Sequence, residues 1–146
     1  MWRTYQRRAP CRLQVPRAPT GHCVACRVTC EDPEDGFKPT CGSITELSFR
    51  STPNVWGYFS VKAGGGIHEF SDSQIGHLFA WGPTRADAIK AMLVALKDIR
   101  IRGEICTIVD YVCDMLQHPD WAGDRIHTGE RRTRTCLQHS HVSRTC

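Results

Sequence analysis

The sequence lacks a hydrophobic run long enough to cross a membrane, because charged or polar residues interrupt each apolar segment. A membrane-spanning helix needs about 20 consecutive apolar residues. The opening MWRTYQRRAP carries positive charge, but no apolar stretch of about 7 to 15 residues follows it, as a secretory signal would require. We therefore expect a cytoplasmic chain that has no membrane partner.

Motifs for nucleotide or nucleophilic chemistry are also missing. The glycines at 64–66 have no GxxxxGK[ST] frame and no helix after them, so they predict a turn between two strands. His68 and His77 lie in expected strands with no nucleophile that could complete a Ser/His/Asp set. The residues by themselves therefore identify no catalytic group.

The composition is that of an ordinary globular protein. The chain has 146 residues, of which 40 % are hydrophobic and 23 % charged, so one domain with one core is expected. The net charge is +4, but the arginines concentrate in residues 1–17 and 125–144, and no basic helix or aromatic-basic platform accompanies them. We interpret them as solvated basic tails and expect no nucleic-acid partner.

Cysteine is abundant, with nine in the chain. Without a secretory signal the thiols are expected to stay reduced. Cys23 and Cys26 have the spacing of a zinc half-site, but a step of three residues along a strand directs two side chains to opposite faces. Structural roles are therefore favoured for both.

Two further groups were weighed as metal ligands. The carboxylates of EDPEDG lack the ladder of an EF-hand and predict a solvated turn. A weaker alternative, a zinc-binding regulator, would use a set near the C-terminus: Cys136, His139, His141 and Cys146. No metal site is assigned to either group.

The hydrophobic pattern predicts an α+β fold, with a mostly antiparallel sheet backed by two amphipathic helices. Alternation and turn residues predict strands at 22–30, 43–50, 54–62, 67–70 and 77–81, with a turn at 71–76. Apolar residues at helical spacing predict helices at 84–100 and from 107 to just before 119. We expect this domain at 21–129, between a flexible leader at 1–20 and a disordered tail at 130–146.

The stretch from 54 to 82 organises the predicted sheet. In its first strand Val55 and Phe59 alternate with Trp56 and Tyr58, so both faces carry large side chains and at least one must be covered. The following helix should cover that face through an apolar stripe: Ala86, Ile89, Met92, Leu93, Leu96 and Ile99. Thr84 with Asp87, and Thr107 with Asp110, have the spacing of capping boxes at the two helix starts.

Several short sequence motifs in this region are characteristic of one protein family. The runs NVWGYFSV, HEFSDSQIGH, FAWG and TRADAI, together with DGFKP, ELSFRS, VALKDIRIRGE and TIVDY, resemble the C-terminal subdomain of the biotin carboxylase domain of eukaryotic acetyl-CoA carboxylase. The resemblance covers about residues 21–129.

This resemblance implies a parent enzyme, a ligase, that carboxylates biotin with ATP and bicarbonate and feeds malonyl-CoA into fatty-acid synthesis. The parent would use biotin, ATP and Mg or Mn, and the ATP-grasp core that holds them precedes the portion matched here. The chain alone is therefore expected to bind no cofactor and to be inactive. Arg50 cannot be matched to the family's biotin-side arginine, so no catalytic residue is carried over.

The resemblance does imply two non-catalytic sites. Asn54, Trp56 and Phe79 match family positions that line a pocket for polyketide inhibitors of dimerisation. Trp81 and Arg85 resemble the family's dimer-contact edge, although Pro83 departs from the family pattern between them. The expected partners are the rest of the carboxylase or a second biotin carboxylase domain.

Two hypotheses of different classes follow. The first is a fragment of acetyl-CoA carboxylase that is not catalytic without its ATP-grasp core. The second is a small interaction module that associates with itself or with full-length carboxylase through the surface that its missing neighbour leaves bare.

Overall fold

The computed structural model of the chain describes residues 18–126. Its strands form three sheets, ordered β1-β7-β5, β2-β3 and β6-β4-β8, and every pairing within them is antiparallel. The elements are β1 (His22–Thr29), β2 (Glu31–Asp32), β3 (Lys38–Pro39), β4 (Gly42–Ser48), β5 (Val55–Phe59), β6 (Gly66–Ile67), β7 (Gln74–Gly82), α1 (Arg85–Asp98), β8 (Arg100–Gly103), α2 (Val109–Gln117) and α3 (Pro119–Ala122). The predicted α+β class with antiparallel strands is confirmed.

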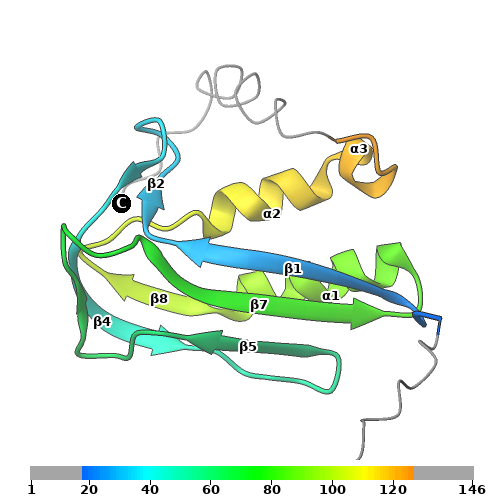
Figure 1. Cartoon of the computed structure of the whole chain (residues 1–146), viewed down its shortest axis with the longest axis horizontal. Helices are drawn as coiled ribbons and strands as arrows, with labels where there is room; N and C mark the ends of the chain where they lie inside the picture. The colour runs from blue at the N-terminus through cyan, green and yellow to red at the C-terminus, as the bar shows by residue number, and fades with distance from the viewer. Residues whose placement is uncertain (1–17, 127–146) are drawn as a thin grey trace, which may run out of the picture.

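The core lies between the sheet β1-β7-β5 and α1, which covers one face of that sheet (Figure 1). The alternation of β1 buries Val24, Cys26 and Val28, as the sequence predicts. From β7 the buried side chains include Leu78 and Ala80, and both are fully enclosed. The helix contributes Ala88, Ile89, Met92, Ala95 and Leu96.

Thr84 is the N-cap of α1, as the sequence predicts: its hydroxyl accepts from the Asp87 N–H at 3.2 Å and donates to the Asp87 carboxylate at 2.7 Å. Two other details of the helix differ from the prediction. The helix ends at Asp98, and residues 100–103 form β8, which pairs with β4. In this stretch the β-branched Ile101 lies between two exposed arginines and opposite Leu47 of β4, an alternation that favours a strand once β4 is available. Ala86 of the predicted apolar stripe is exposed, and Ala88 takes its place in the core.

The prediction of a capping box at Thr107 and Asp110 was wrong. Helix α2 begins at Val109, with Ile108 as its N-cap and no side-chain cap bond from Thr107. Helix α2 ends at Gln117, before Pro119, as expected. Pro119 also opens the short α3, where a proline in the first turn is favoured because it has no N–H to leave unpaired.

The predicted strand at 67–70 is reduced to β6, because the chain turns at His68, whose carbonyl accepts from the N–H and hydroxyl of Ser71. Strand β7 begins at Gln74, inside the turn expected at 71–76. The turn-rich segment after β1 closes into the small β2-β3 hairpin. In β4 a register shift between Ile44 and Glu46 breaks the predicted alternation of its faces.

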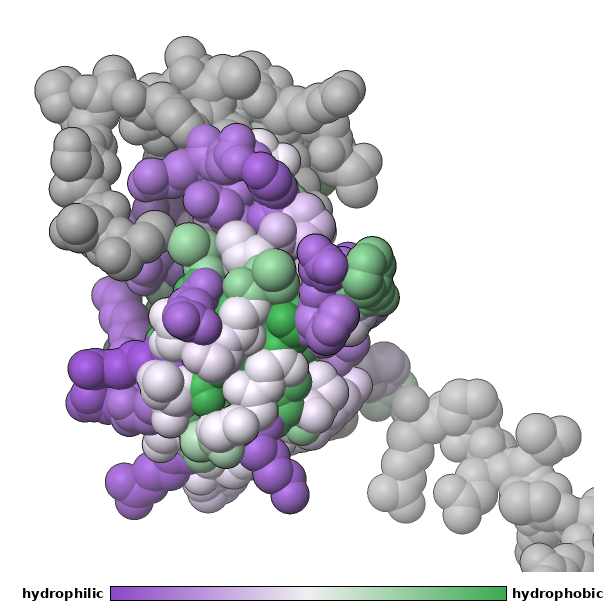
Figure 2. Space-filling model, turned by 90° about the vertical axis from the view of Figure 1, so that its left-hand side faces the viewer, coloured by the Kyte–Doolittle hydropathy of each residue, from purple (hydrophilic) through white to green (hydrophobic). Residues whose placement is uncertain are grey.

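The predicted tail lies outside the described residues, as does most of the predicted leader. Within 18–126, no helix has the length and apolar character that a membrane crossing requires. Figure 2 views the molecule from the left-hand side of Figure 1 and shows hydrophilic residues around a paler centre in which hydrophobic residues form separate patches. That end therefore presents no broad apolar area.

Candidate functional site

The face of the central sheet opposite α1 carries an exposed group of rings, which we call the aromatic face: Trp56, Tyr58, His77, Phe79 and Trp81. The first two come from β5 and the others from β7. Because side chains alternate along a strand, the residues that flank the buried Val55, Leu78 and Ala80 in sequence must point outward. The register then places Trp56 opposite Phe79 and Tyr58 opposite His77.

The rings of Trp56, Tyr58 and His77 each contact the ring of Phe79. The centroids of Trp56 and Phe79 lie 5.7 Å apart with planes inclined by 14°, and those of His77 and Phe79 lie 6.2 Å apart at 17°. Tyr58 completes the group, 6.3 Å from Phe79 and 5.2 Å from His77. Each such contact contributes about 0.5–1.5 kcal/mol beyond area burial, so the rings hold one another in place.

These rings are organised but not buried. Trp56 is 45 % exposed, Tyr58 59 % and Trp81 37 %. A contiguous apolar surface of this kind is typical of a surface that another polypeptide or a ligand covers. The core is complete on the other side of the sheet, so folding of residues 18–126 does not explain this clustering.

The neighbouring strand β1 leaves the rings accessible. Its outward residues Cys23, Ala25 and Arg27 pair in register with Trp81, Phe79 and His77. The small side chains of Cys23 and Ala25 do not cover the rings, and Arg27 adds a guanidinium at one end of the face. The Trp81 indole N–H donates to the Thr20 carbonyl at 3.1 Å.

The structure brings together Trp56 and Phe79, two of the residues predicted to line an inhibitor pocket. Asn54, the third, lies exposed immediately before β5, and its carbonyl accepts from the Trp81 N–H at 2.8 Å. The predicted pocket residues therefore share one edge of the aromatic face. Alternation placed Tyr58 on the same strand face as Trp56, but Tyr58 was not named as a site residue. His77 was missed, although its alternation with Leu78 carried the signal.

Arg85, predicted with Trp81 as a dimer contact, has different surroundings. Its guanidinium donates to the Trp121 carbonyl at 3.1 and 3.3 Å and pairs with the Asp124 carboxylate at 3.0 Å. It also lies 5.9 Å from the centre of the Trp121 ring. Arg85 thus fastens the start of α1 to the segment around α3, while Trp81 belongs to the aromatic face.

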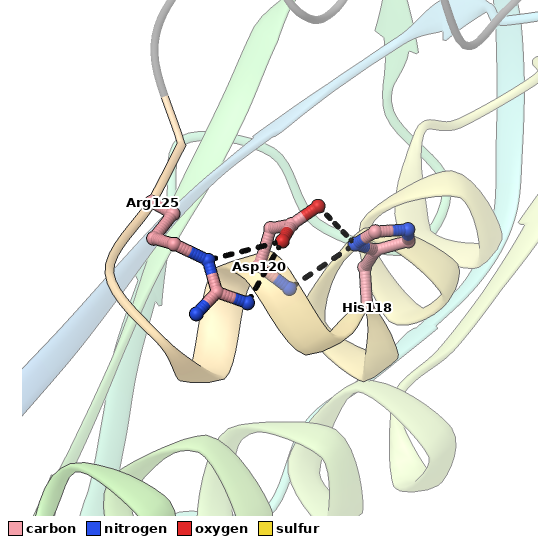
Figure 3. Close-up of polar contacts among 3 residues, drawn as sticks. All are labelled: His118, Asp120 and Arg125. Carbon is pink, nitrogen blue, oxygen red and sulfur yellow. Dashed lines mark hydrogen bonds and ion pairs between the residues drawn. The ribbon is translucent and has the colours of Figure 1, made fainter.

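A second polar cluster fixes the last described turn (Figure 3). The Asp120 N–H donates to His118 Nδ1 at 3.2 Å, which caps α3, and Asp120 Oδ1 accepts from Arg125 at 3.1 and 3.4 Å. The imidazole and carboxylate are also 3.2 Å apart. Among residues 18–126 no nucleophile accompanies this cluster, and its bonds close the turn after α2.

Cys23, Cys26, Cys30, Cys41 and Cys113 are free thiols. Burial raises the pKa of Cys26 to about 11 and that of Cys30 to about 12, and smaller contributions come from Cys113 and Glu31 respectively. Cys23 is exposed and Cys26 buried, which confirms that their side chains point to opposite faces. The zinc half-site is therefore not formed by this pair.

The residues of 18–126 do not fit a divalent cation. They contain no group of three potential ligands placed around one point. In the acidic turn, Asp32 accepts from the Glu34 N–H, Glu31 accepts from the Ser73 hydroxyl, and Asp35 pairs with Lys38 at 3.6 Å. The carboxylates are directed to separate partners. The weaker candidate set at 136–146 lies outside the described residues.

A family model for the biotin carboxylase C-terminal domain matches residues 25–130. The chain belongs to this family. Over 120 residues it is 62 % identical to acetyl-CoA carboxylase 1 of Arabidopsis thaliana, which covers 82 % of this chain and 5 % of the relative. Over 111 residues it is 57 % identical to the acetyl-CoA carboxylase of Dictyostelium discoideum, which covers 76 % and 5 %.

Solved structures of carboxylases contain a domain with the same fold. The complete multifunctional pyruvate carboxylase of Rhizobium etli superposes with a TM-score of 0.75 at 30 % identity, over 85 % of this chain and 12 % of that one. The biotin carboxylase of Campylobacter jejuni, in complex with an ATP analogue, gives 0.71 at 32 % identity, over 79 % and 25 %. The resemblance found in the sequence is confirmed, and this biotin carboxylase C-terminal domain spans about 5 % of the curated relatives' length.

Proposed function

We propose that this biotin carboxylase C-terminal domain works as a non-catalytic part of an acetyl-CoA carboxylase, completing an ATP-dependent core that carboxylates biotin. The observation that carries the proposal is the match of residues 25–130, at up to 62 % identity, to relatives of which the chain spans 5 %. In this role ATP, biotin and Mg or Mn are held by the core, and the cytoplasm is its compartment. Cell fractionation that recovers the chain in an organelle would contradict that location.

The aromatic face is the surface through which the domain meets its partner. Its rings are preorganised by mutual stacking, so binding them costs little side-chain entropy. Burying aromatic side chains that are now about half exposed contributes roughly 25 cal/mol for each Å² covered. We assign this face to a second biotin carboxylase domain, and Asn54, Trp56 and Phe79 to the inhibitor pocket at its edge.

The test is reconstitution. The full chain is mixed with the biotin carboxylase region of a plant acetyl-CoA carboxylase that lacks the segment matching residues 25–130, and ATP hydrolysis dependent on biotin and bicarbonate is measured. We expect no turnover by either component alone and turnover in the mixture. Turnover by the chain alone, or a mixture as inactive as its parts, would contradict the proposal.

A matched pair of variants identifies the surface. Trp56→Ser removes a ring from the aromatic face, whereas Val94→Ser removes an exposed apolar side chain from α1, where Val94 is 56 % exposed. If the reconstituted enzyme works as a dimer of carboxylase domains joined through this face, Trp56→Ser lowers turnover at limiting chain concentration and Val94→Ser does not. Equal effects of the two variants would remove the assignment of the face.

The second candidate function is an interaction module that binds full-length carboxylase without restoring activity to a truncated one. The exposed aromatic face favours it, since such a face can occupy the surface that a carboxylase domain offers to its own partner. Size-exclusion chromatography with and without full-length carboxylase separates the two. Co-elution together with a failed reconstitution supports the module, and a strictly monomeric, non-associating chain argues against it.

A further inference from the structure

A groove of about 470 Å³ lies between the end of α1, the strand β8 and the helix α2. Leu96, Ile99 and Ile101 give it apolar surface from α1 and β8, and Val109 does so from the start of α2. Its volume falls within the range of about 300–1,000 Å³ that is typical of ligand clefts. The groove therefore has room for side chains of another segment.

The rim of this groove is acidic along α2. Asp110, Asp114 and Gln117 line the groove at helical spacing, so they follow one face of the helix over about 10 Å. Both aspartates are exposed, and within residues 18–126 neither carboxylate has a hydrogen bond or an ion pair. Lys97 of α1 is the one cation among the lining residues, which leaves them a net charge of −1.

The charges of both walls act on one thiol inside the groove. Burial raises the pKa of the Cys113 thiol, the Asp110 and Asp114 carboxylates add to the rise, and Lys97 opposes it. The two aspartates and the lysine therefore surround the same space. A cationic group that enters this space meets two carboxylates that no described residue neutralises.

The last described residues bring the chain back to the C-terminal end of α2. The Arg125 N–H donates to the Asp120 carbonyl at 2.9 Å, and the Arg125 guanidinium donates to the Asp120 carboxylate at 3.1 Å (Figure 3). The Asp120 N–H in turn donates to His118, the residue that ends α2. The chain beyond Ile126 therefore starts beside the end of the helix at which Gln117 lines the groove.

A basic segment follows within reach. Residues 131–134 read RRTR, and they lie five to eight residues after Ile126. Since an extended chain spans about 3.3 Å per residue, these arginines reach about 16–26 Å from Ile126. The distance along α2 from Gln117 back to Asp110 is only about 10 Å. The family match ends at residue 130, so this segment lies outside the matched domain.

We propose that residues 131–134 of this chain dock into the groove, with their guanidinium groups against Asp110 and Asp114 and their methylene stems over the apolar floor. Arginine suits both parts, because its guanidinium binds a carboxylate at two points and its stem covers apolar surface. A short covalent link gives the segment an effective concentration on the order of millimolar at the groove, so weak exposed ion pairs suffice. Docking orders residues 131–134, and the predicted disorder then applies to the residues after them.

This docking does not depend on the proposed function, which rests on the aromatic face. Helix α1, which forms one wall of the groove, covers the opposite face of the central sheet from the rings. A docked segment leaves the rings exposed, and a carboxylase domain bound on the rings leaves the two aspartates accessible. The two proposals can therefore fail separately.

Limited proteolysis of the full chain by trypsin tests the docking, because trypsin cuts after arginine and a docked segment is cut only when it is released. Mass spectrometry follows cleavage after residues 131, 132 and 134 at low ionic strength, relative to cleavage after Arg144. The double variant Asp110→Asn/Asp114→Asn removes both charges with little change in size. We expect the three bonds to be cut about fivefold faster in this variant. Equal rates in the variant and the unsubstituted chain would overturn the proposal.

The matched control is Glu69→Gln/Asp72→Asn, which neutralises two exposed carboxylates that do not line the groove. It should leave the three cleavage rates unchanged. A comparable acceleration in this control would overturn the proposal, because the overall charge of the domain and not the groove would then retain the segment. About 1 M salt, which shortens the Debye length to about 3 Å, should raise the rates of the unsubstituted chain to those of the groove variant.

Other occupants of the groove give different results. Protection that grows with chain concentration would assign the groove to the segment of another copy, and protection that needs an added carboxylase core would assign it to that core. Either result overturns the proposal. If circular dichroism shows that the double variant has unfolded, Asp114→Asn alone decides, since it leaves the first turn of α2 intact. We then expect cleavage about twofold faster, and an unchanged rate would count against docking.

Discussion

Replacing Leu78 with alanine tests the orientation of β7, on which both the core and the aromatic face depend. Leu78 is fully enclosed between the sheet and α1. Removing its buried methyl and methylene groups loses about 0.8 kcal/mol for each group, and the cavity left behind adds to that, so about 3 kcal/mol of stability should be lost. The comparison is Tyr58→Ala on the opposite face, where the side chain is 59 % exposed and its loss should cost about 1 kcal/mol.

Urea unfolding followed by circular dichroism measures both values. With a urea slope of about 2 kcal/mol per molar, Leu78→Ala should lower the midpoint by roughly 1.5 M and Tyr58→Ala by about 0.5 M or less, with unchanged slopes. The reasoning would be refuted if Tyr58→Ala were as destabilising as Leu78→Ala. In that case the rings would belong to the core, and the face would not be free for a partner.

The remaining predictions concern the thiols and the helix cap. In the native chain an alkylating reagent at pH 8 should modify the exposed Cys23 well before Cys26, because a pKa of about 11 leaves roughly a thousandth of the Cys26 thiol ionised. Mass spectrometry that finds both cysteines modified together would contradict the burial of Cys26. Since burial raises this pKa from 9.0, the native state favours the protonated thiol, and unfolding titrations should show a contribution to stability that is complete below pH 9 and is lost between pH 9 and about 11. Thr84→Ala should cost about 1 kcal/mol by leaving the Asp87 N–H without its cap, and an unchanged thermal midpoint would show that this hydroxyl is not needed.

The sequence predicted the central sheet well because its signals are local. From Cys23 to Val28 in β1, alternation separates buried from exposed side chains, and in β5 it separates buried and half-buried from exposed ones. The family motifs at residues 54–82 agree with that pattern. The cap at Thr84 was also predictable, since a capping box lies within one helical turn.

The failures came where distant residues decide. Residues 100–103 follow a helix without a break in apolar spacing, and only the pairing with β4 makes them a strand. Thr107 has the spacing of a cap, but the backbone bond from Ile108 to Thr29 sets where α2 begins. The dimer contact of Arg85 and Trp81 comes from family resemblance and stays a prediction, and the structure adds that the Arg85 guanidinium reaches Trp121 and Asp124 across the fold.

The aromatic face shows both what the sequence could predict and what it could not. The membership of Trp56 and Phe79 came from family resemblance, and the structure adds their 5.7 Å stacking and the neighbouring Tyr58 and His77. The position of β1 at the border of the sheet required the strand order, which no local pattern specifies. Sequence reasoning could place residues on faces but could not say which strand borders the sheet.

The most direct test of the account titrates the full chain into a biotin carboxylase region that lacks the matching segment, and follows biotin- and bicarbonate-dependent ATP hydrolysis. The account predicts that turnover rises from background to saturation as the chain is added, and that Trp56→Ser needs a higher concentration than Val94→Ser to reach the same rate. Turnover that stays at background across the titration, while the chain itself remains folded, would contradict the claim that this domain completes a carboxylase core.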